Sequence, residues 1–420
     1  MDVIQDLEFR GLLYQVTDRE ALVRRLAEGP ITLYNGFDPT ADSLTIGNLV
    51  VILLLRRFQL AGNHPIGVVG GGTGLIGDPS GKSSERQLNE SEVVEAWTAK
   101  VRDQLARFLD FDVKSNPARI VNNYDWLSIL GTVEFLRDVG KHFPVNYMLA
   151  KESVNSRLDA GISFTEFSYM IMQSYDYLWL NRNMGCELQT GGSDQWGNIT
   201  AGVDLIRRSH GRSVFGLTSP LVTNADGSKL GKTVLGAIWL DDQLTTPYQF
   251  YQYWINTSDD DIIPYIKIFT FLSHSEIKDL ESEVKSNPWE RVAQRTLAEE
   301  ATTLVHDKQA MNRAENISQA LFYGKVSDLT AKEIEEGLHD VPTHVIEGDN
   351  KIKLVDLLAE AKISPSKRRA REDIVNGAIS VNDQRCSDLD RLVIPADRLE
   401  GLYIVIRRGK SKYHLVKWIV

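Results

Sequence analysis

The chain is poor in the features that mark secreted, disulfide-bonded, metal-binding and membrane proteins. Its 420 residues include only two cysteines, Cys186 and Cys386, which lie far apart and form no motif. A disulfide framework or a protein-ligated metal is therefore not expected, and the composition fits the reducing cytoplasm. No apolar run reaches the ~18 residues that span a bilayer, so no membrane association is expected. The first residues, Met-Asp-Val-Ile-Gln-Asp-Leu-Glu, are acidic and lack the basic start of a signal peptide.

The sequence also lacks internal repeats and low-complexity tracts, and a chain of this length predicts two or three domains at about 150 residues each. Its charge is spread unevenly. Residues 351–420 contain 15 Lys and Arg against 9 Asp and Glu, a balance of +6, so the rest of the chain carries −16 of the total of −10. An acidic body with a basic terminal segment predicts that one module contacts a polyanion.

The first half of the chain alternates strand-like and helix-like segments. Helices are expected at Leu49–Leu60 and Glu90–Leu109. Strands are expected at Ile31–Phe37, Pro65–Gly70, Ala118–Val121, Cys186–Thr190 and Leu217–Val222. This order predicts an α/β fold with a Rossmann-like, doubly wound parallel sheet. The segment between about 125 and 180 is mostly helical in pattern and is expected to be an insertion in this sheet domain.

The second half changes character at Pro247. Helical patterns cover Tyr248–Asn256, Asp259–Phe271, Ser275–Ser286, Pro288–Val305 and Asp307–Leu321. A polar, turn-rich connector follows, and then a small α+β module with helices at Lys351–Ala361 and Ser366–Asn376 and strands at Ile379–Val381 and Leu402–Arg407. We therefore expect a Rossmann-like α/β domain over 1–246, an α-helical domain over 247–323, a connector over 324–350 and a small α+β domain over 351–420.

A polar stripe crosses the apolar segment Phe164–Leu180. Tyr169, Gln173 and Asp176 are spaced by four and then three residues, so a helix would place them on one narrow face. Buried Asp and Gln side chains are costly unless they are hydrogen-bonded. The stripe predicts either a pocket floor that binds a hydroxyl or ammonium group, or a polar network between helices in a core.

The junction from Leu33 to Asn48 leads from a strand into a helix. Gly36 permits close backbone approach, and Thr40 and Thr45 offer hydroxyls that could reach phosphate oxygens. The free amides and the dipole at a helix N-terminus favour an anion. A tight strand–helix turn uses the same residue types.

The glycine-rich run from Gly70 to Ser83 partly matches two nucleotide motifs. Gly72–Gly77 has the dinucleotide spacing, but Asp78-Pro79 turns the chain away where a helix should begin. The end resembles a P-loop, yet Ile76 stands where the first glycine is required. A third interpretation is that the glycines admit a small substrate, with Asp78 as a ligand.

Two further glycine-rich loops follow. In Gly191–Gly197 the glycines give access, and Asp194 and Gln195 can bind hydroxyl, amine or carboxylate groups. The loop 224–236 has two lysines three residues apart, which suits a mobile phosphate clamp. A solvated surface loop is the alternative.

Taken together, these motifs resemble the bacterial tyrosyl-tRNA synthetases, which are class I aminoacyl-tRNA synthetases. The resemblance covers the whole chain and is strongest at Tyr34–Leu44, Gly77–Lys82, Phe164–Asp176 and Gly191–Thr200. Thr45-Ile-Gly-Asn48 stands where the class carries His-Ile-Gly-His, and Lys229-Leu-Gly-Lys-Thr233 where it carries Lys-Met-Ser-Lys-Ser. The resemblance implies that 1–246 is the catalytic domain and 247–323 an anticodon-recognition domain. The C-terminal segment 351–420 is similar to an S4-type RNA-binding domain.

The resemblance implies a role for each candidate residue. The tyrosine phenol would contact Tyr34 and Asp176, its ammonium would contact Asp78, Tyr169 and Gln173, and Gln195 would lie near its carboxylate and the reacting centre. ATP would be bound by Gly36, Asp38, Thr40, Thr45, Gly47, Asn48, Gly192, Asp194, Lys229, Lys232 and Thr233. Catalysis would rest on Thr40, Gln195, Lys229 and Lys232. The phosphates of tRNA would be contacted by Lys367, Arg368, Arg369, Arg371, Arg407, Arg408, Lys410 and Lys412.

The resemblance also implies the reaction and its partners. The carboxylate of L-tyrosine attacks the α-phosphate of ATP with Mg²⁺, pyrophosphate leaves, and the tyrosyl group passes to the terminal adenosine of tRNA(Tyr). No general base is needed, since the carboxylate is already ionised, so catalysis rests on positioning and charge stabilisation. A cytoplasmic homodimer is implied, with Phe164 near the interface, and DNA is not expected as a partner.

One departure from the class pattern concerns Thr45, because a hydroxyl is shorter than an imidazole and cannot be cationic. Asn48 is a milder change, since an amide can still hydrogen-bond a ribose. Three alternatives stay open: a catalytically weak paralogue, an RNA-binding or regulatory protein with a vestigial Rossmann-like domain, and an NAD-dependent oxidoreductase. The last explains neither the basic C-terminal segment nor the lysine loop.

Overall fold

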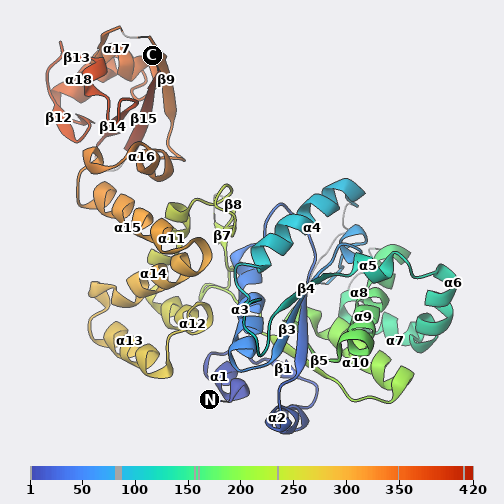
Figure 1. Ribbon diagram of the computed structural model, residues 1–420. Helices are drawn as coiled ribbons and strands as arrows, with labels where there is room; N and C mark the ends of the chain where they lie inside the picture. The colour runs from blue at the N-terminus through green and yellow to red at the C-terminus, as the bar shows by residue number, and fades with distance from the viewer. Residues whose placement is uncertain are drawn as a thin grey trace. The chain divides into compact units, whose positions relative to one another are not determined.

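The computed structural model describes residues 2–80, 88–155, 158, 161–233, 236–348, 350–409 and 412–419 (Figure 1). The chain divides into two compact units. The first comprises Met1–Thr245 and Thr257–Ala301, and the second Thr246–Asn256 and Thr302–Val420. Within the described ranges, no helix has the length and apolarity to cross a membrane, and both cysteines are free thiols.

The first unit is built on a six-stranded sheet in the order β1-β6-β5-β2-β3-β4. All neighbours from β6 to β4 are parallel, which confirms the predicted doubly wound sheet. The strands are β2 Thr32–Phe37, β3 His64–Val69, β4 Arg119–Asn122, β5 Cys186–Gly192 and β6 Phe215–Ser219. The edge strand β1, Gln15–Val16, pairs antiparallel with β6. Two residues are too short for a periodic signal, so the sequence does not reveal β1.

Helices cover both faces of this sheet (Figure 1). On one face lie α3 Ile46–Leu60 and α4 Ser91–Leu105, where a Cβ at Gly67 of β3 would touch Leu105 of α4. On the other lie α9 Phe164–Met184 and α10 Trp196–His210, which share a buried core with Tyr34 of β2. The chain begins with α1 Val3–Phe9 and α2 Arg19–Glu28. These layers bury the sheet on both sides, as parallel sheets require.

The strand order reverses between β2 and β5. Because β2, β3 and β5 run parallel, their carboxyl ends meet at one edge, where ligands of open α/β sheets bind. At this edge the backbone of Gly70 lies so close to Asp38 that a Cβ at position 70 would collide with the Asp38 carboxylate. The sequence motifs at 36–38, 70–78 and 191–195 therefore lie around one location.

The segment expected to be a helical insertion is helical but interrupted. Gly131 and Pro144 each precede a new helix, and α9 completes the segment. The short helices are α5 Tyr124–Leu127, α6 Thr132–Glu134, η2 Phe135–Val139, η3 Gly140–His142, α7 Val145–Leu149 and α8 Glu152–Asn155.

The helices after residue 246 lie close to their expected bounds. They are α11 Pro247–Ile255, α12 Asp259–Phe269, α13 His274–Ser286, α14 Val292–His306 and α15 Lys308–Phe322. The single helix expected over 288–305 is wrong at its start. Arg291 adopts φ 50, which ends the short helix η5 Pro288–Glu290 before α14 begins. The two compact units divide these helices, with α12 and α13 in the first and α11 and α15 in the second.

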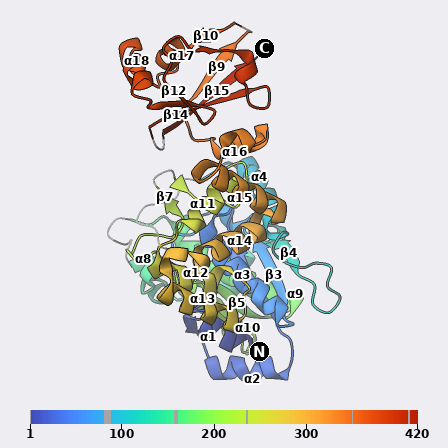
Figure 2. The same cartoon turned by 90° about the vertical axis from the view of Figure 1, so that its left-hand side faces the viewer.

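The C-terminal segment folds around a five-stranded sheet in the order β12-β11-β14-β15-β9 (Figure 2). The strands are β9 Thr343–Glu347, β11 Ile379–Val381, β12 Gln384–Cys386, β14 Tyr403–Arg408 and β15 Lys412–Ile419. The polar, turn-rich connector expected over 324–350 contains regular elements, namely η6 Val326–Asp328, α16 Ala331–Gly337 and β9. Strand β9 pairs in parallel with β15, a partner about 70 residues away that no local pattern reveals. The domain boundaries themselves stay predictions.

Both faces of this sheet are packed. On one face Ile404 and Ile406 contact a core that includes residues of α17 Leu354–Glu360 and α18 Lys367–Val375. On the other, Tyr403 and Val405 pack against residues of α15 and α16. A short ribbon of β10 Ile352–Lys353 and β13 Leu392–Val393 completes the module. Successive residues of β14 therefore point to opposite faces.

Candidate active site

Two polar groups are buried between β2 and α9. The Asp176 side chain, on a residue only 4% exposed, accepts hydrogen bonds from Nδ2 of Asn123 at 2.9 Å and Nε1 of Trp126 at 2.7 Å. The hydroxyl of Tyr34 is also buried and has no hydrogen-bond partner among the described residues. Since burying an unpaired hydroxyl costs free energy, its presence indicates a group that is satisfied by a ligand.

The electrostatics of this location favour a hydrogen-bond donor as ligand. The pKa of Asp176 is raised to about 7, because burial and the charge of Asp38 raise it more than the hydrogen bonds from Asn123 and Trp126 lower it. Burial and the nearby Asp176 carboxylate raise the pKa of Tyr34 well above its ordinary value, so its hydroxyl stays protonated. A ligand hydroxyl that donates to Asp176 would stabilise the ionised carboxylate.

A hydrogen-bonded chain leads from Asp176 to the end of β2. Nδ2 of Asn123 also donates to Oγ1 of Thr73 at 2.8 Å, and Thr73 donates to Oδ1 of Asp38 at 2.7 Å. The hydroxyl of Tyr169 donates to Oδ2 of Asp38 at 2.6 Å. Burial, together with Asp38, raises the pKa of Tyr169 well above its ordinary value. This chain connects a residue expected at the tyrosine ammonium with one expected at ATP.

A second chain runs through Gln195. Its Nε2 donates to Oδ2 of Asp78 at 2.7 Å and to Oδ2 of Asp194 at 3.1 Å, while its Oε1 accepts from Nε2 of Gln173 at 3.3 Å. Oε1 of Gln173 is buried with no hydrogen-bond partner in the described part of the chain. The structure thus brings these four predicted residues together, and a ligand amine could bind among their oxygens.

The edge of the sheet next to these chains is open. Gly36 is exposed although its neighbours in β2 are buried, and a Cβ there would have no atom within 4 Å. Gly192 ends β5, and a Cβ there would approach Oδ1 of Asp194 to 2.6 Å. A pocket beside Asp38 and the exposed Thr40 is also lined by Pro39, Gly74, Ile76, Gly77, Leu88 and Asn89. This space suits a flat or phosphorylated ligand that approaches the backbone closely.

The start of α3 borders the same edge. Thr45 is the N-cap residue, and Oδ1 of Asn48 accepts hydrogen bonds from the Thr45 amide at 3.0 Å and from its hydroxyl at 3.1 Å. Gly47 between them is exposed. The two positions that differ from the class signature therefore bond to each other and cap the helix.

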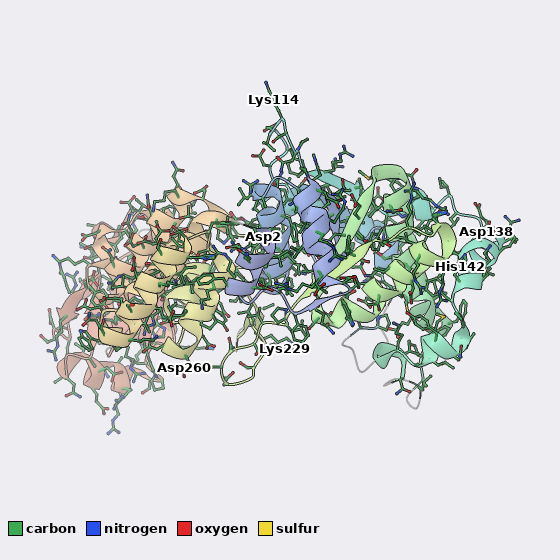
Figure 3. The ribbon with its side chains drawn as sticks, turned by 90° about the horizontal axis from the view of Figure 1, so that it is seen from below. Asp2, Lys114, Asp138, His142, Lys229 and Asp260 are labelled. Carbon is green, nitrogen blue, oxygen red and sulfur yellow. The ribbon has the colours of Figure 1, made fainter. Side chains whose placement is uncertain are left out.

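The lysine loop also reaches the start of α3. The Ile46 amide donates to the carbonyl of Ile238 at 3.1 Å, and the Ile238 amide donates to the carbonyl of Gly231 at 2.9 Å. Lys229 and Lys232 are both exposed, and Figure 3 shows Lys229 in the loop. Lys232 and Thr233 form β7, which pairs with β8 Gly236–Ala237. The backbone of the loop that carries both lysines is thus attached to the start of α3.

The sequence patterns did not identify four residues of this site, namely Thr73, Asn123, Trp126 and Asn198. Asn198 donates to Oγ of Ser80 and to Oε1 of Gln195, both at 3.3 Å. A signal existed for Asn123, because Asn122 and Asn123 follow the predicted strand Ala118–Val121, at the carboxyl end of a parallel strand. Nothing local distinguishes Trp126 from a core residue.

The basic residues of the C-terminal segment do not form one uniform patch. In α18 Lys367, Arg368, Arg369 and Arg371 are exposed, but Arg369 pairs with the buried Asp373 at 3.1 Å. Arg408 also pairs with Asp373, at 2.9 Å, and points to the opposite face of β14 from Arg407. Lys412 is exposed beside Arg408, and Lys410 lies outside the described residues.

Fold and site together define a class of protein. A parallel sheet carries buried polar groups, one of which is a hydroxyl without a partner among the described residues. Beside them, an open glycine-lined edge meets a helix N-terminus and a loop with two lysines. This is the arrangement of a class I aminoacyl-tRNA synthetase, an enzyme that joins an amino acid to ATP before charging tRNA.

Comparison with known proteins identifies the family. The sequence-family model described as tRNA synthetases class I (W and Y) matches residues 26–323. A second family model, described as the tyrosine–tRNA ligase SYY-like C-terminal domain, matches residues 333–416. The chain is 60% identical to tyrosine–tRNA ligase of Bacillus caldotenax over 419 residues, covering 100% of both, and 55% identical to tyrosine–tRNA ligase 1 of Bacillus subtilis (strain 168), covering 99% of both. The structure of a C-terminally truncated mitochondrial tyrosyl-tRNA synthetase of Aspergillus nidulans, 31% identical, superimposes with a TM-score of 0.70 over 76% of this chain and 94% of that one. The chain therefore belongs to the tyrosine–tRNA ligase family.

Proposed function

We propose that this protein activates L-tyrosine with ATP and transfers the tyrosyl group to tRNA(Tyr). The observation that carries the proposal is the buried pair formed by Asp176 and the unpaired hydroxyl of Tyr34, in a chain of this family. A phenol can donate to Asp176 and accept from Tyr34, so it satisfies both groups at once. Phenylalanine would leave both unsatisfied, which provides selection by hydrogen bonding.

The ammonium of tyrosine is assigned to Asp78, Tyr169 and Gln173. The carboxylate of Asp78 and the unpaired Oε1 of Gln173 support this role. Tyr169 would act as an acceptor while it donates to Asp38. Gln195, bonded to Asp78 and Gln173, would orient the substrate carboxylate toward ATP.

ATP is assigned to the open edge, with its adenosine near Gly36, Asp38, Gly47, Asn48, Gly192 and Asp194. The tyrosine carboxylate oxygen bonds to the α-phosphorus of ATP, the bond from that phosphorus to the β-phosphate bridge breaks, and pyrophosphate leaves. Thr40, Lys229 and Lys232 would stabilise the charge that develops on pyrophosphate, and Thr45 and Thr233 are assigned to ATP. Such preorganised groups accelerate the step because they bind the transition state more strongly than the ground state.

Mg²⁺ is proposed to bind through the phosphates of ATP. Among the described residues, no cluster of three or more His, Cys, Asp or Glu side chains could hold a metal ion. Mg²⁺ commonly keeps several waters and binds through substrate phosphates, where it neutralises charge.

The C-terminal module is proposed to bind tRNA(Tyr). The exposed cations of α18 and Lys412 support a phosphate-contacting surface. Arg369 and Arg408 each form an ion pair with Asp373, which supports an additional structural role for these two arginines. Phosphate contacts position the RNA and make binding depend on salt.

A homodimer is proposed as the working form. Several large apolar side chains of the insertion are exposed, namely Ile129, Val133, Leu136, Val145 and Phe164. An exposed apolar group of this kind is typical of a protein interface. The two free thiols support a reducing, cytoplasmic location.

Tyrosine-dependent exchange between pyrophosphate and ATP tests the first step, and charging of tRNA(Tyr) tests the second. We expect exchange with tyrosine and none with phenylalanine. The variant Arg368→Gln/Arg371→Gln should keep exchange and lose charging efficiency, with Arg24→Gln, an exposed arginine of α2, as the control. Equal loss of both activities would contradict the division of labour, and absence of exchange would contradict the function. Sedimentation of an active monomer at micromolar concentration would contradict the dimer.

A further inference from the structure

The first residues of the lysine loop are attached to helix α12. The backbone amide of Ala225 donates to Oδ1 of Asp261 at 2.7 Å, and the hydroxyl of Tyr265 donates to Oδ1 of Asn224 at 2.6 Å. Asp261 and Tyr265 are four residues apart, so they lie one above the other on the same helix face. Figure 3 shows Lys229 in this loop beside the start of α12, which Asp260 marks. Two hydrogen bonds therefore join the loop to a helix that contributes no predicted substrate contact.

Both anchoring side chains are themselves held in place. Tyr265 is only 3% exposed and packs in the core of the first unit. Oδ2 of Asp261 accepts a hydrogen bond from Oγ of Ser258, the N-cap residue of α12, at 2.8 Å. The same carboxylate thus connects the helix start to the loop, and it also lies where the helix dipole favours a negative charge.

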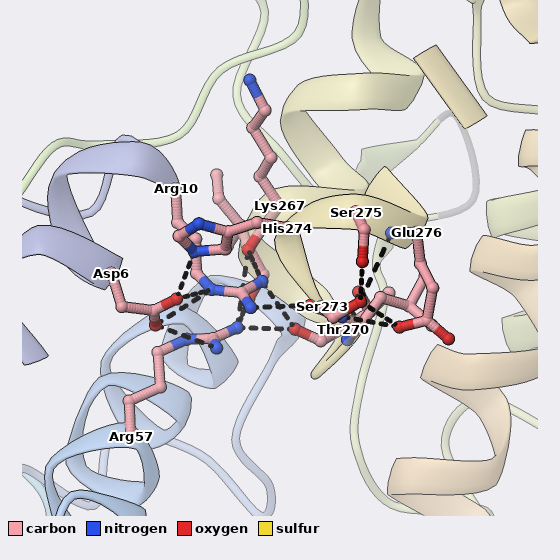
Figure 4. A network of polar contacts seen from close by, with 11 residues as sticks. Asp6, Arg10, Arg57, Lys267, Thr270, Ser273, His274, Ser275 and Glu276 are labelled. Carbon is pink, nitrogen blue, oxygen red and sulfur yellow. Dashed lines mark hydrogen bonds and ion pairs between the residues drawn. The ribbon is translucent and has the colours of Figure 1, made fainter. Parts of the chain in front are cut away.

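The other end of α12 is fixed to the body of the first unit (Figure 4). Nη2 of Arg57, which belongs to α3, donates to the carbonyl of Thr270 at 2.6 Å, and Nη1 of Arg10 donates to the carbonyl of Lys267 at 3.0 Å. Asp6 accepts from Arg10 at 2.9 Å and pairs with Arg57 at 3.6 Å. Helix α12 therefore cannot shift along its axis without breaking buried charge-assisted bonds.

The far side of the lysine loop is attached to α3. The Ile46 amide donates to Ile238, and the Ile238 amide to Gly231, as described above. Between the two attachments, residues 224–228 form a turn that closes on itself, since the Asn224 amide donates to the carbonyl of Ser228 at 2.9 Å. Lys229 and Lys232 follow this turn. Their reach toward the helix N-terminus at Thr45 is consequently set by α12 on one side and by α3 on the other.

We propose that Asp261 and Tyr265 are positioning residues for adenylate formation, which hold the start of the loop so that Lys229 and Lys232 meet the departing pyrophosphate. The inference rests on the proposed role of the two lysines. A loop released at one end spreads its lysines over more orientations, and a small misplacement of a catalytic group can cost on the order of 10²-fold in rate. Tyrosine binds elsewhere and should be unaffected.

The test is single-turnover adenylate formation by the full chain. Tyr265→Phe removes only the hydroxyl, which bonds to Asn224 and, at 3.4 Å, to the carbonyl of Thr223. Asp261→Ala removes the acceptor for the Ala225 amide and the Ser258 hydroxyl. We expect each to lower the rate about ten- to a hundredfold with unchanged tyrosine affinity. Asp260→Ala, an exposed residue in the same helical turn, is the matched control and should keep the normal rate. Asp261→Asn, which retains one oxygen acceptor, should recover part of the loss.

A second background separates positioning from general damage. In Lys229→Ala/Lys232→Ala the loop carries no lysines, so Tyr265→Phe should cause no further loss. If Tyr265→Phe lowered the rate by the same factor with and without the two lysines, the proposal would be overturned, because residues that act independently have additive effects in free energy. A normal rate in Tyr265→Phe and Asp261→Ala would overturn it as well. A normal rate in the double lysine variant alone would instead contradict the proposed role of the lysines. If Asp261→Ala fails to fold, Tyr265→Phe decides.

Discussion

The affinity for tyrosine should depend on pH through Asp176. Burial raises the pKa of this carboxyl to about 7 in the free protein, and a phenol that donates to it requires the ionised form. Protons therefore compete with tyrosine below neutral pH. For a group of pKa about 7, the dissociation constant should rise about twofold at pH 7 and about elevenfold at pH 6 relative to pH 9, the latter being about 1.4 kcal/mol.

Tryptophan fluorescence during tyrosine titrations between pH 5.5 and 8 offers the assay. Trp126 donates to Asp176 and stacks on Trp179 at 4.2 Å, so its emission should report occupancy. Asp176→Asn cannot ionise, so its weaker binding should be independent of pH, which excludes other titrating groups. A change below twofold between pH 8 and pH 6 in the unaltered protein would refute the reasoning. It would mean that Asp176 stays ionised throughout or that the phenol binds elsewhere.

Three further substitutions have defined outcomes. Tyr34→Phe should weaken tyrosine binding by about 0.5–1.5 kcal/mol and lower the preference for tyrosine over phenylalanine by the same amount. The urea concentration at the unfolding midpoint should not fall, because the hydroxyl that is removed has no partner among the described residues. A large loss of stability would contradict the unpaired state of this hydroxyl. Thr45→His should raise the rate of adenylate formation without changing the tyrosine KM, because an imidazolium can give the departing pyrophosphate one charge-assisted hydrogen bond, which contributes about 1.5–3 kcal/mol at best. The hydrogen bond from the Thr45 hydroxyl to Asn48 is lost in this variant. An unchanged rate in stopped flow would mean that position 45 does not contact the nucleotide. Asp6→Asn should lower the free energy of unfolding by about 3–5 kcal/mol, because the buried guanidinium groups of Arg10 and Arg57 would lose the carboxylate that pairs with both. A decrease of less than about 1 kcal/mol in urea unfolding would contradict a stabilising role of these two ion pairs.

Sequence periodicity identified the long elements because they are locally encoded. Helix α9 follows from an apolar stretch with a four-plus-three polar stripe, and the sheet strands follow from apolar runs between glycine-rich turns. Strand β9 did not follow, since Thr343–Glu347 is short and half-exposed and becomes a strand only by pairing with β15. The opposite orientation of Arg407 and Arg408 was available from the alternation of strand side chains.

The sequence by itself determined the family, the order of the elements and the candidate residues, because motifs and periodicity are local properties of the chain. Only the tertiary structure decided which polar groups meet. The partners of Asp176 are Trp126 and Asn123, 50 and 53 positions away, and no spacing rule reaches that far. The attachment of the lysine loop to α12 likewise joins residues 36 positions apart. Burial then sets the pKa of Asp176, since the free energy of a charge depends on the atoms that replace water around it.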